Sequence, residues 1–74
     1  MPARFYFDIE VGDDTIKDEI GAEAAGLDEA LAEARPAVAE MAEDIGAGET
    51  LVMVVRDADD TPVARLPIKR PPAQ

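Results

Sequence analysis

Residues 57–61 are the part of the sequence that could most plainly do chemistry. They follow the apolar stretch Leu51 to Val55, and Asp57, Asp59 and Thr61 have the D-x-D-x-T spacing with which magnesium-dependent phosphotransferases place a nucleophile and a general acid. That chemistry needs a large α/β sheet, a later basic residue for the phosphate and further carboxylates for the metal. Only 13 residues follow Thr61. We therefore interpret the segment as a turn between two strands, because Asp is a typical turn residue.

Residues 8–19 have some of the features of a twelve-residue calcium-binding loop. Asp8, Glu10 and Glu19 stand at its first, third and last positions. Such a loop needs glycine at its sixth position and an oxygen ligand at its fifth. Here Gly12 stands at the fifth position and Asp13 at the sixth. The sequence therefore predicts a hairpin in this segment and no metal site.

The remaining residue types offer little for catalysis. The chain contains no Ser, Cys, His, Asn or Trp, so acids, lysines, threonines and Tyr6 are the groups left for acid–base or nucleophilic work. Carboxylate pairs catalyse only where burial separates their pKa values, and a small domain has little room for such a pocket. Asp18 shares its strand parity with Ile16 and Ile20, and we interpret it as bonding to nearby backbone. We predict neither enzymatic activity nor a cofactor.

Two strands and a helix are expected in the first two thirds of the chain. Residues 4–11 alternate between apolar and polar side chains, which predicts a half-buried strand, and residues 15–20 return as a shorter strand with Ile16 and Ile20 inward. From Leu27 to Ile45 apolar residues recur at helical spacing, with Gly46 as a left-handed stop. Pro36 predicts a kink there, or alternatively two short helices.

Two further strands complete the predicted fold. Residues 50–57 are the most apolar and so suit a central strand, whereas residues 63–69 contain Pro67, which suits a sheet edge. We predict an α+β fold of order ββαββ, in which one helix packs on a four-stranded antiparallel sheet. The expected strand order is 2-1-3-4, with the β-grasp-like order 2-1-4-3 as the alternative. Residues 1–70 would form a single domain and residues 71–74 a disordered tail.

Size and charge limit the possible partners. The chain has 74 residues and no cysteine, so a small core without disulfides would gain stability from self-association. The net charge is −10, which argues against nucleic acid and leaves room for a basic protein partner. The sequence shows neither the pattern of a secretory signal nor an apolar run long enough to cross a membrane. We expect a cytoplasmic protein.

Several residues of the strands form a candidate interaction face. Alternation places apolar side chains and five of the seven basic residues on the side of the sheet away from the helix. Such a mixture is typical of contact surfaces, although ordinary outer strand positions can also carry it. We predict a non-catalytic interaction module that forms a homodimer or small oligomer through the sheet face or edge. The alternative is an acidic decoy or adaptor that binds a basic protein surface through its helix face. The candidate interaction face consists of Arg4, Tyr6, Val52, Val54, Arg56, Val63 and Arg65.

Two short motifs stand out: residues 4–8 read R-F-Y-F-D, and residues 18–21 fit the pattern D-x-x-G. In both motifs the chain resembles a small bacterial family of domains of unknown function, which opens with R-x-Y-F-D or R-F-Y-F-D and continues with D-x-x-G. An alanine-rich acidic helix and an apolar strand ending in a D-x-D-G-like turn follow. This chain departs from the family at Asp60, where Gly is usual, and at Pro36, where a helix former is usual. The resemblance implies no activity and no functional residues.

Overall fold

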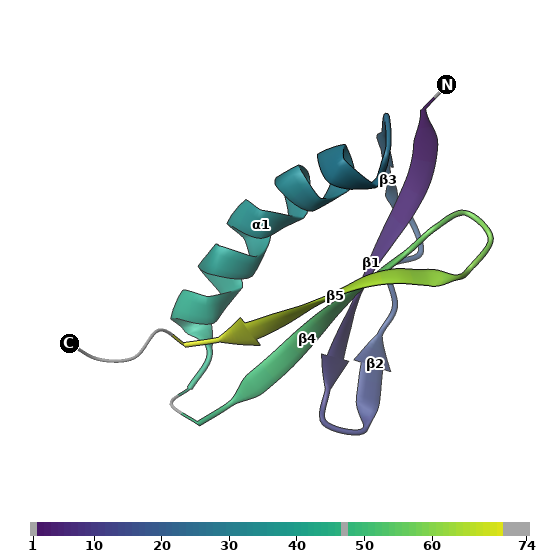
Figure 1. Ribbon diagram of the computed structural model, residues 1–74. Coiled ribbons are helices and arrows are strands. Elements are labelled where there is room, and N and C mark those ends of the chain that lie inside the picture. Colours follow the sequence, from purple (N-terminus) through teal and green to yellow (C-terminus); the bar gives the residue numbers. More distant parts are fainter. Residues whose placement is uncertain (1, 47, 71–74) are drawn as a thin grey trace.

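The computed structural model describes residues 2–46 and 48–70, so the predicted disordered tail lies outside the described residues. One helix arches over one side of a twisted antiparallel sheet (Figure 1). The predicted α+β class is confirmed, with one more strand than expected. The elements are β1 (Ala3–Val11), β2 (Asp14–Ile16), β3 (Ala22–Ala24), α1 (Leu27–Asp44), β4 (Thr50–Arg56) and β5 (Pro62–Lys69).

The strand order is β2-β1-β4-β5, and β3 also pairs with β1. The two apolar strands β1 and β4 lie in the middle, where both of their edges are hydrogen-bonded. Pro67 lies in the edge strand β5, as its missing N–H group requires. This order confirms the prediction 2-1-3-4 once the additional strand β3 is set aside, and it excludes the alternative 2-1-4-3.

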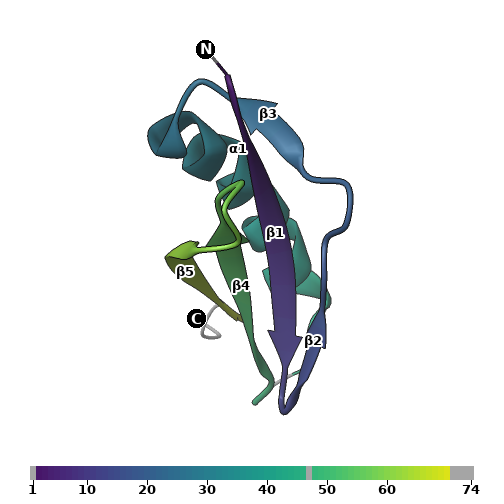
Figure 2. The same cartoon turned by 90° about the vertical axis from the view of Figure 1, so that its right-hand side faces the viewer.

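The edge of the sheet beyond β1 is interrupted. Both β2 and β3 lie along the same side of β1 (Figure 2), where Ile16 pairs with Ile9 and Ala22 pairs with Phe5. Between these pairs, residues 17–21 lie opposite only three residues of β1. We call residues 17–21 the edge loop. The prediction of one continuous strand over residues 15–20 is therefore wrong.

Ile16 lies on the helix side of the sheet, as predicted, because it pairs with Ile9, but neither Ile16 nor Ile20 is buried as an inward position would require. Their side chains are 64% and 81% exposed. Ile16 lies at the edge of the sheet beside Ile9, and Ile20 belongs to the edge loop, which leaves the strand ladder. Sequence alternation cannot detect such an interruption, because it assumes that every residue of a strand stays in the ladder.

Small residues allow α1 to lie close to the sheet. Ala30, Ala34 and Ala42 are buried on the helix side that faces the strands. The buried residues form two clusters, one around Met53 and Ile68 and the other around Phe5 and Val55. Phe7 packs against both of them. The side chains that join β1 to the helix are therefore those that alternation placed inward.

The helix continues through Pro36, which is exposed. The alternative of two short helices is therefore wrong. Solvent can reach the backbone groups around an exposed proline, which lowers the cost of the missing hydrogen bond. The helix ends at Asp44, and the next residue, Ile45, is already extended. The left-handed stop expected at Gly46 is not observed, since the positive φ in this connection belongs to Gly48.

Candidate functional site

The outer face of the sheet, turned away from α1, carries a cluster of charged groups centred on Arg56. The guanidinium of Arg56 donates from Nε to Asp8 Oδ2 at 2.5 Å and from Nη2 to Asp8 Oδ1 at 3.0 Å. Its Nη1 donates to Asp60 Oδ1 at 2.5 Å. Its central carbon lies 4.9 Å from the centre of the Tyr6 ring, within cation–π range. The strand register explains this meeting, because Tyr6 pairs directly with Arg56 and Asp8 follows two residues later on the same face.

Asp18 connects this cluster to the edge loop. Its backbone N–H donates to Asp8 Oδ1 at 3.0 Å, and its carbonyl oxygen accepts from Arg56 Nη2 at 3.1 Å. Its own carboxylate accepts from the N–H groups of Phe7, Ile20 and Gly21 at 3.0–3.1 Å. The prediction that Asp18 bonds to nearby backbone is confirmed. Its additional bond to Phe7 replaces a strand contact that the edge loop interrupts. We call Tyr6, Asp8, Asp18, Arg56 and Asp60 the outer-face network.

Gly21 closes the edge loop where a side chain would not fit. Its φ is +73°, and a Cβ atom placed there would lie 2.8 Å from the carbonyl oxygen of Phe5 and 2.9 Å from the Tyr6 ring. Only glycine, which has no Cβ atom, allows both the left-handed backbone and the close approach to β1 at this position. Arg4 holds the same end of the loop, donating to the carbonyl oxygen of Ile20 at 2.8 Å and to Glu23 Oε1 at 3.1 Å.

The outer-face network keeps its two inner carboxyl groups ionised. The Arg56 guanidinium lowers the pKa of Asp8 below its usual value, outweighing the opposing effect of burial. Burial acts to raise the pKa of Asp18, but the three backbone N–H groups together lower it further than burial raises it. Asp8 and Asp60 in turn raise the pKa of Arg56 above its already high value. Asp8, Asp18 and Arg56 are therefore all charged over the whole neutral range, which suits a fixed structural contact rather than proton transfer.

The phosphotransferase-like segment is the turn between β4 and β5. Asp57 Oδ1 accepts from the backbone N–H groups of Asp59 at 2.9 Å and Thr61 at 3.0 Å, and its own N–H donates to the Thr61 carbonyl oxygen at 2.9 Å. The predicted turn is confirmed. Asp60 has a φ of +66°, the conformation that favours glycine, and its side chain reaches Arg56. This explains how an Asp can replace the glycine usual at that position.

The calcium-like segment is the hairpin of β1 and β2, as predicted. Gly12 has a positive φ of 61° and begins its two-residue turn. The carboxylate of Asp8, which the calcium arrangement would need as its first ligand, is engaged by Arg56 and by the N–H of Asp18. Within residues 2–46 and 48–70, no three acidic side chains gather closely enough to hold a metal ion.

The candidate interaction face is more enclosed than its sequence suggested. Val54 was expected to be exposed but retains only 6% of its accessible surface. An ion pair at 2.6 Å between Arg65 Nη2 on β5 and Glu10 Oε1 on β1 spans β4 next to Val54. Val63 stays exposed at 37%. Of the arginines assigned to this face, Arg4, Arg56 and Arg65 all form intramolecular ion pairs.

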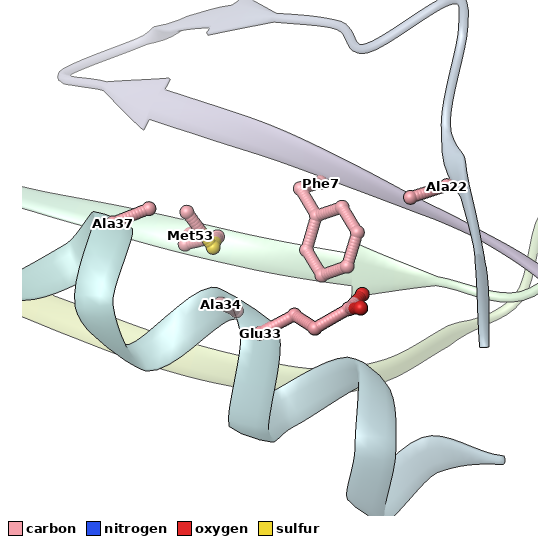
Figure 3. Close-up of a pocket in the computed structure, with 6 residues that line it drawn as sticks. All are labelled: Phe7, Ala22, Glu33, Ala34, Ala37 and Met53. Carbon is pink, nitrogen blue, oxygen red and sulfur yellow. The ribbon is translucent and has the colours of Figure 1, made fainter. Parts of the chain in front are cut away.

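An apolar groove that the sequence did not predict lies on the helix side of the sheet. It has a volume of about 270 Å³ and opens between α1 and the strands β1 and β3 (Figure 3). The ring of Phe7 and the side chain of Met53 form its floor, and the carboxylate of Glu33 stands at its rim. The groove exists because small side chains occupy positions where larger ones would fill the space. These are Ala22, Ala34 and Ala37.

The apolar surface continues beyond the groove along β1. Ile9 and Val11 follow Phe7 on the same face, and Val11 is exposed. Ile16 lies beside Ile9 across the hairpin and is more exposed still. We call Val11, Ile16 and the groove together the uncovered margin, because α1 borders the groove without filling it and leaves Val11 and Ile16 exposed. Sequence reasoning missed it by assuming that the helix covers the whole inner face.

The contacts of the outer-face network are easier to predict from the sequence than the apolar groove is. Arg56 was assigned to the outer face, and the alternation of residues 4–11 puts Asp8 on the polar side of its strand, so their opposite charges could have indicated a pair. The strand register shows that the two side chains meet. The groove depends instead on where the helix axis lies, which periodicity does not specify.

Comparison with known proteins identifies the family but no activity. The search of curated proteins found no match, and neither did the search of solved structures. Among the described residues, no helix has the length and apolar character needed to cross a membrane. The sequence profile of one family, described as a domain of unknown function (DUF6894), matches residues 4–69, from the first strand to the last. The match includes each residue of the outer-face network and the glycine that closes the edge loop, and the chain therefore belongs to the DUF6894 family.

Proposed function

We propose that this domain is a non-catalytic interaction module that associates with copies of itself along the uncovered margin. The observation that supports this proposal is the exposure of Val11 and Ile16 beside an open apolar groove. Burying apolar surface of this kind stabilises association by roughly 25 cal/mol per Å² before the costs of binding are subtracted. A chain of this length also has a small core, so a second copy would add to its stability.

The contacts already formed on the outer face make the uncovered margin the better surface for self-association. On the outer face, Val54 is already covered and three arginines already have carboxylate partners. A partner that binds there would have to break these ion pairs. If it left them in place, it would gain little binding free energy from the arginines. At the uncovered margin, no ion pair of the described residues would have to break.

Solution mass tests this function directly. We expect sedimentation velocity to find dimers in the tens of micromolar range. Ile16→Glu should shift the chain toward monomer, whereas Val63→Glu, on the outer face, should not. Circular dichroism of both variants would verify that they fold. A native chain that remains monomeric over this range would contradict self-association, and a response to Val63→Glu alone would move the contact to the outer face.

A second candidate function uses the acidic side of α1. The helix carries six acids and one basic residue, Arg35, and none of its acids forms an ion pair within the described part of the chain. This charge suits an adaptor for a basic protein surface. Binding to a cationic probe such as polylysine should weaken steeply with added salt. A Glu40→Lys, Glu43→Lys double variant should bind the probe more weakly, and unchanged binding would contradict this candidate.

A further inference from the structure

We infer that the second copy pairs with strand β2, in an antiparallel arrangement centred on Thr15. The inference rests on the proposed self-association and specifies its geometry. β2 is the last strand on its side of the sheet, and within residues 2–46 and 48–70 no other element lies along its outer edge (Figure 2). The partner would extend the sheet across a twofold axis that passes between the two Thr15 residues. Twofold symmetry is the commonest symmetry of protein dimers.

The hairpin sets which backbone groups point outward. β1 and β2 are joined by the two-residue turn Gly12-Asp13, in which only Gly12 has a positive φ, as in a type II′ turn. In such a hairpin the closing pair, Val11 with Asp14, is hydrogen-bonded, and the next pair is not. The N–H and C=O groups of Thr15 therefore point away from β1, toward the free edge. A strand docked there can bond to Thr15 without disturbing the hairpin.

Charge selects the same register. Antiparallel pairing about Thr15 sets Asp13 opposite the partner's Lys17, and symmetry repeats the pair on the other side of the axis. Asp13 and Lys17 are both exposed, and within residues 2–46 and 48–70 neither takes part in an ion pair. Pairing about Ile16 would instead set Asp14 opposite the partner's Asp18. It would also require backbone groups that β1 already uses.

The apolar side chains fit this arrangement. Ile16 would lie diagonally across the axis from the partner's Ile16, on the side of the sheet that carries the helices. Figure 1 shows β2 at the margin of the sheet farthest from α1, so two helices could remain apart. The edge loop ends the pairing after Lys17, because the chain there leaves the strand ladder. The contact is therefore short, and the two charge pairs carry much of its specificity.

Charge reversal can break this contact and restore it. We expect Asp13→Lys and Lys17→Asp each to raise the dimer dissociation constant by about tenfold, since each replaces two attractive pairs with two repulsive ones. An equimolar mixture of the two variants should form heterodimers, because each position would then face an opposite charge. The double variant should likewise recover the dimer. Sedimentation velocity and native mass spectrometry would measure both results.

Charge reversals at positions away from β2 distinguish the loss of this contact from a general effect of net charge. Asp59→Lys lies at the tip of the other hairpin and Lys69→Asp lies on β5, and neither should alter the dissociation constant more than twofold. The β2 contact would be overturned if the substitutions at Asp13 and Lys17 left the dimer dissociation constant unchanged, or if the two single variants did not form heterodimers when mixed. Self-association itself would not be contradicted by either result. A native monomer would overturn both proposals.

Discussion

The two faces of the sheet are held by different physical means. On the helix side, alanines and larger apolar residues pack in two clusters that depend on volume and on removal from water. On the outer face, Arg56 and two aspartates form contacts that depend on charge, direction and distance. The first arrangement tolerates exchanges among residues of similar size. The second arrangement does not tolerate such exchanges, because each group must have the charge and the hydrogen-bonding atoms that its partners require.

This difference explains where the short motifs of the family lie. The opening motif supplies Tyr6 and Asp8, the D-x-x-G motif supplies Asp18 and Gly21, and the strand before the second turn supplies Arg56. Three segments far apart in the sequence meet in one network that holds the edge loop on β1. The motifs therefore have a structural role that requires no ligand.

The largest effect should follow from removing the buried carboxylate. Asp8→Ala leaves Arg56 and the N–H of Asp18 without their main acceptor, and breaking a buried ion pair typically costs about 3 kcal/mol. Met53→Leu, a change of similar volume on the helix side, should cost less than about 1.5 kcal/mol. Urea unfolding of both variants would measure the difference. Equal losses would mean that the two faces do not differ as described.

The edge loop should be nearly as sensitive at its glycine. Gly21→Ala requires a left-handed alanine and places a methyl group against the Phe5 carbonyl oxygen, so we expect a loss of about 2 kcal/mol or more. Gly26→Ala is the matched control, since Gly26 is extended and no atom lies within 4 Å of the added carbon. It should cost under about 1 kcal/mol. Thermal melts would rank the two, and a reversed order would contradict the close approach.

Acid should weaken the outer face before it weakens the apolar core. The pKa values of Asp8 and Asp18 are lowered in the folded chain, so the unfolded chain takes up protons first as the pH falls. Their contribution to the free energy of unfolding is complete above the ordinary value of 3.8 and is lost as the pH falls through the lower folded values. The fall in stability below pH 3.8 should be shallower in Asp8→Ala. Identical acid profiles for the two chains would exclude this role.

The smallest effect should come from the exposed ion pair of the outer face. Glu10→Gln removes the partner of Arg65, whose side chain is 58% exposed, so the loss should stay below about 1 kcal/mol and shrink with added salt. A loss as large as that of Asp8→Ala would contradict the expected difference between an exposed ion pair and a buried one. Chemical unfolding at low and high salt would decide between these outcomes.

Alternation and proline placement predicted the sheet to a large extent. They placed β1 and β4 at the centre, β5 at an edge and the apolar side of residues 4–11 in the core, because side-chain parity and a missing N–H act locally. They did not predict the division of β2 from β3. That division depends on hydrogen bonds from Asp18 to residues of β1, which lie ten or more positions away in the sequence.

The candidate sites were less predictable. The outer-face residues were assigned to the correct side, but their ion pairs were not predicted, because a pair such as Glu10 with Arg65 joins two strands that are not neighbours. The uncovered margin depends on where α1 lies over the sheet. A stripe of apolar residues gives the side of the helix that is buried, but not which strands lie under it.

The central place of β1 has a consequence for the growing chain on the ribosome. β1 emerges before the helix, but its partner β4 is translated only after the helix is complete. Until then the chain can form a hairpin and a helix, but Phe5 and Phe7 have no central sheet in which to settle. The nascent domain therefore passes through an interval in which it offers aromatic side chains to chaperones and to neighbouring chains.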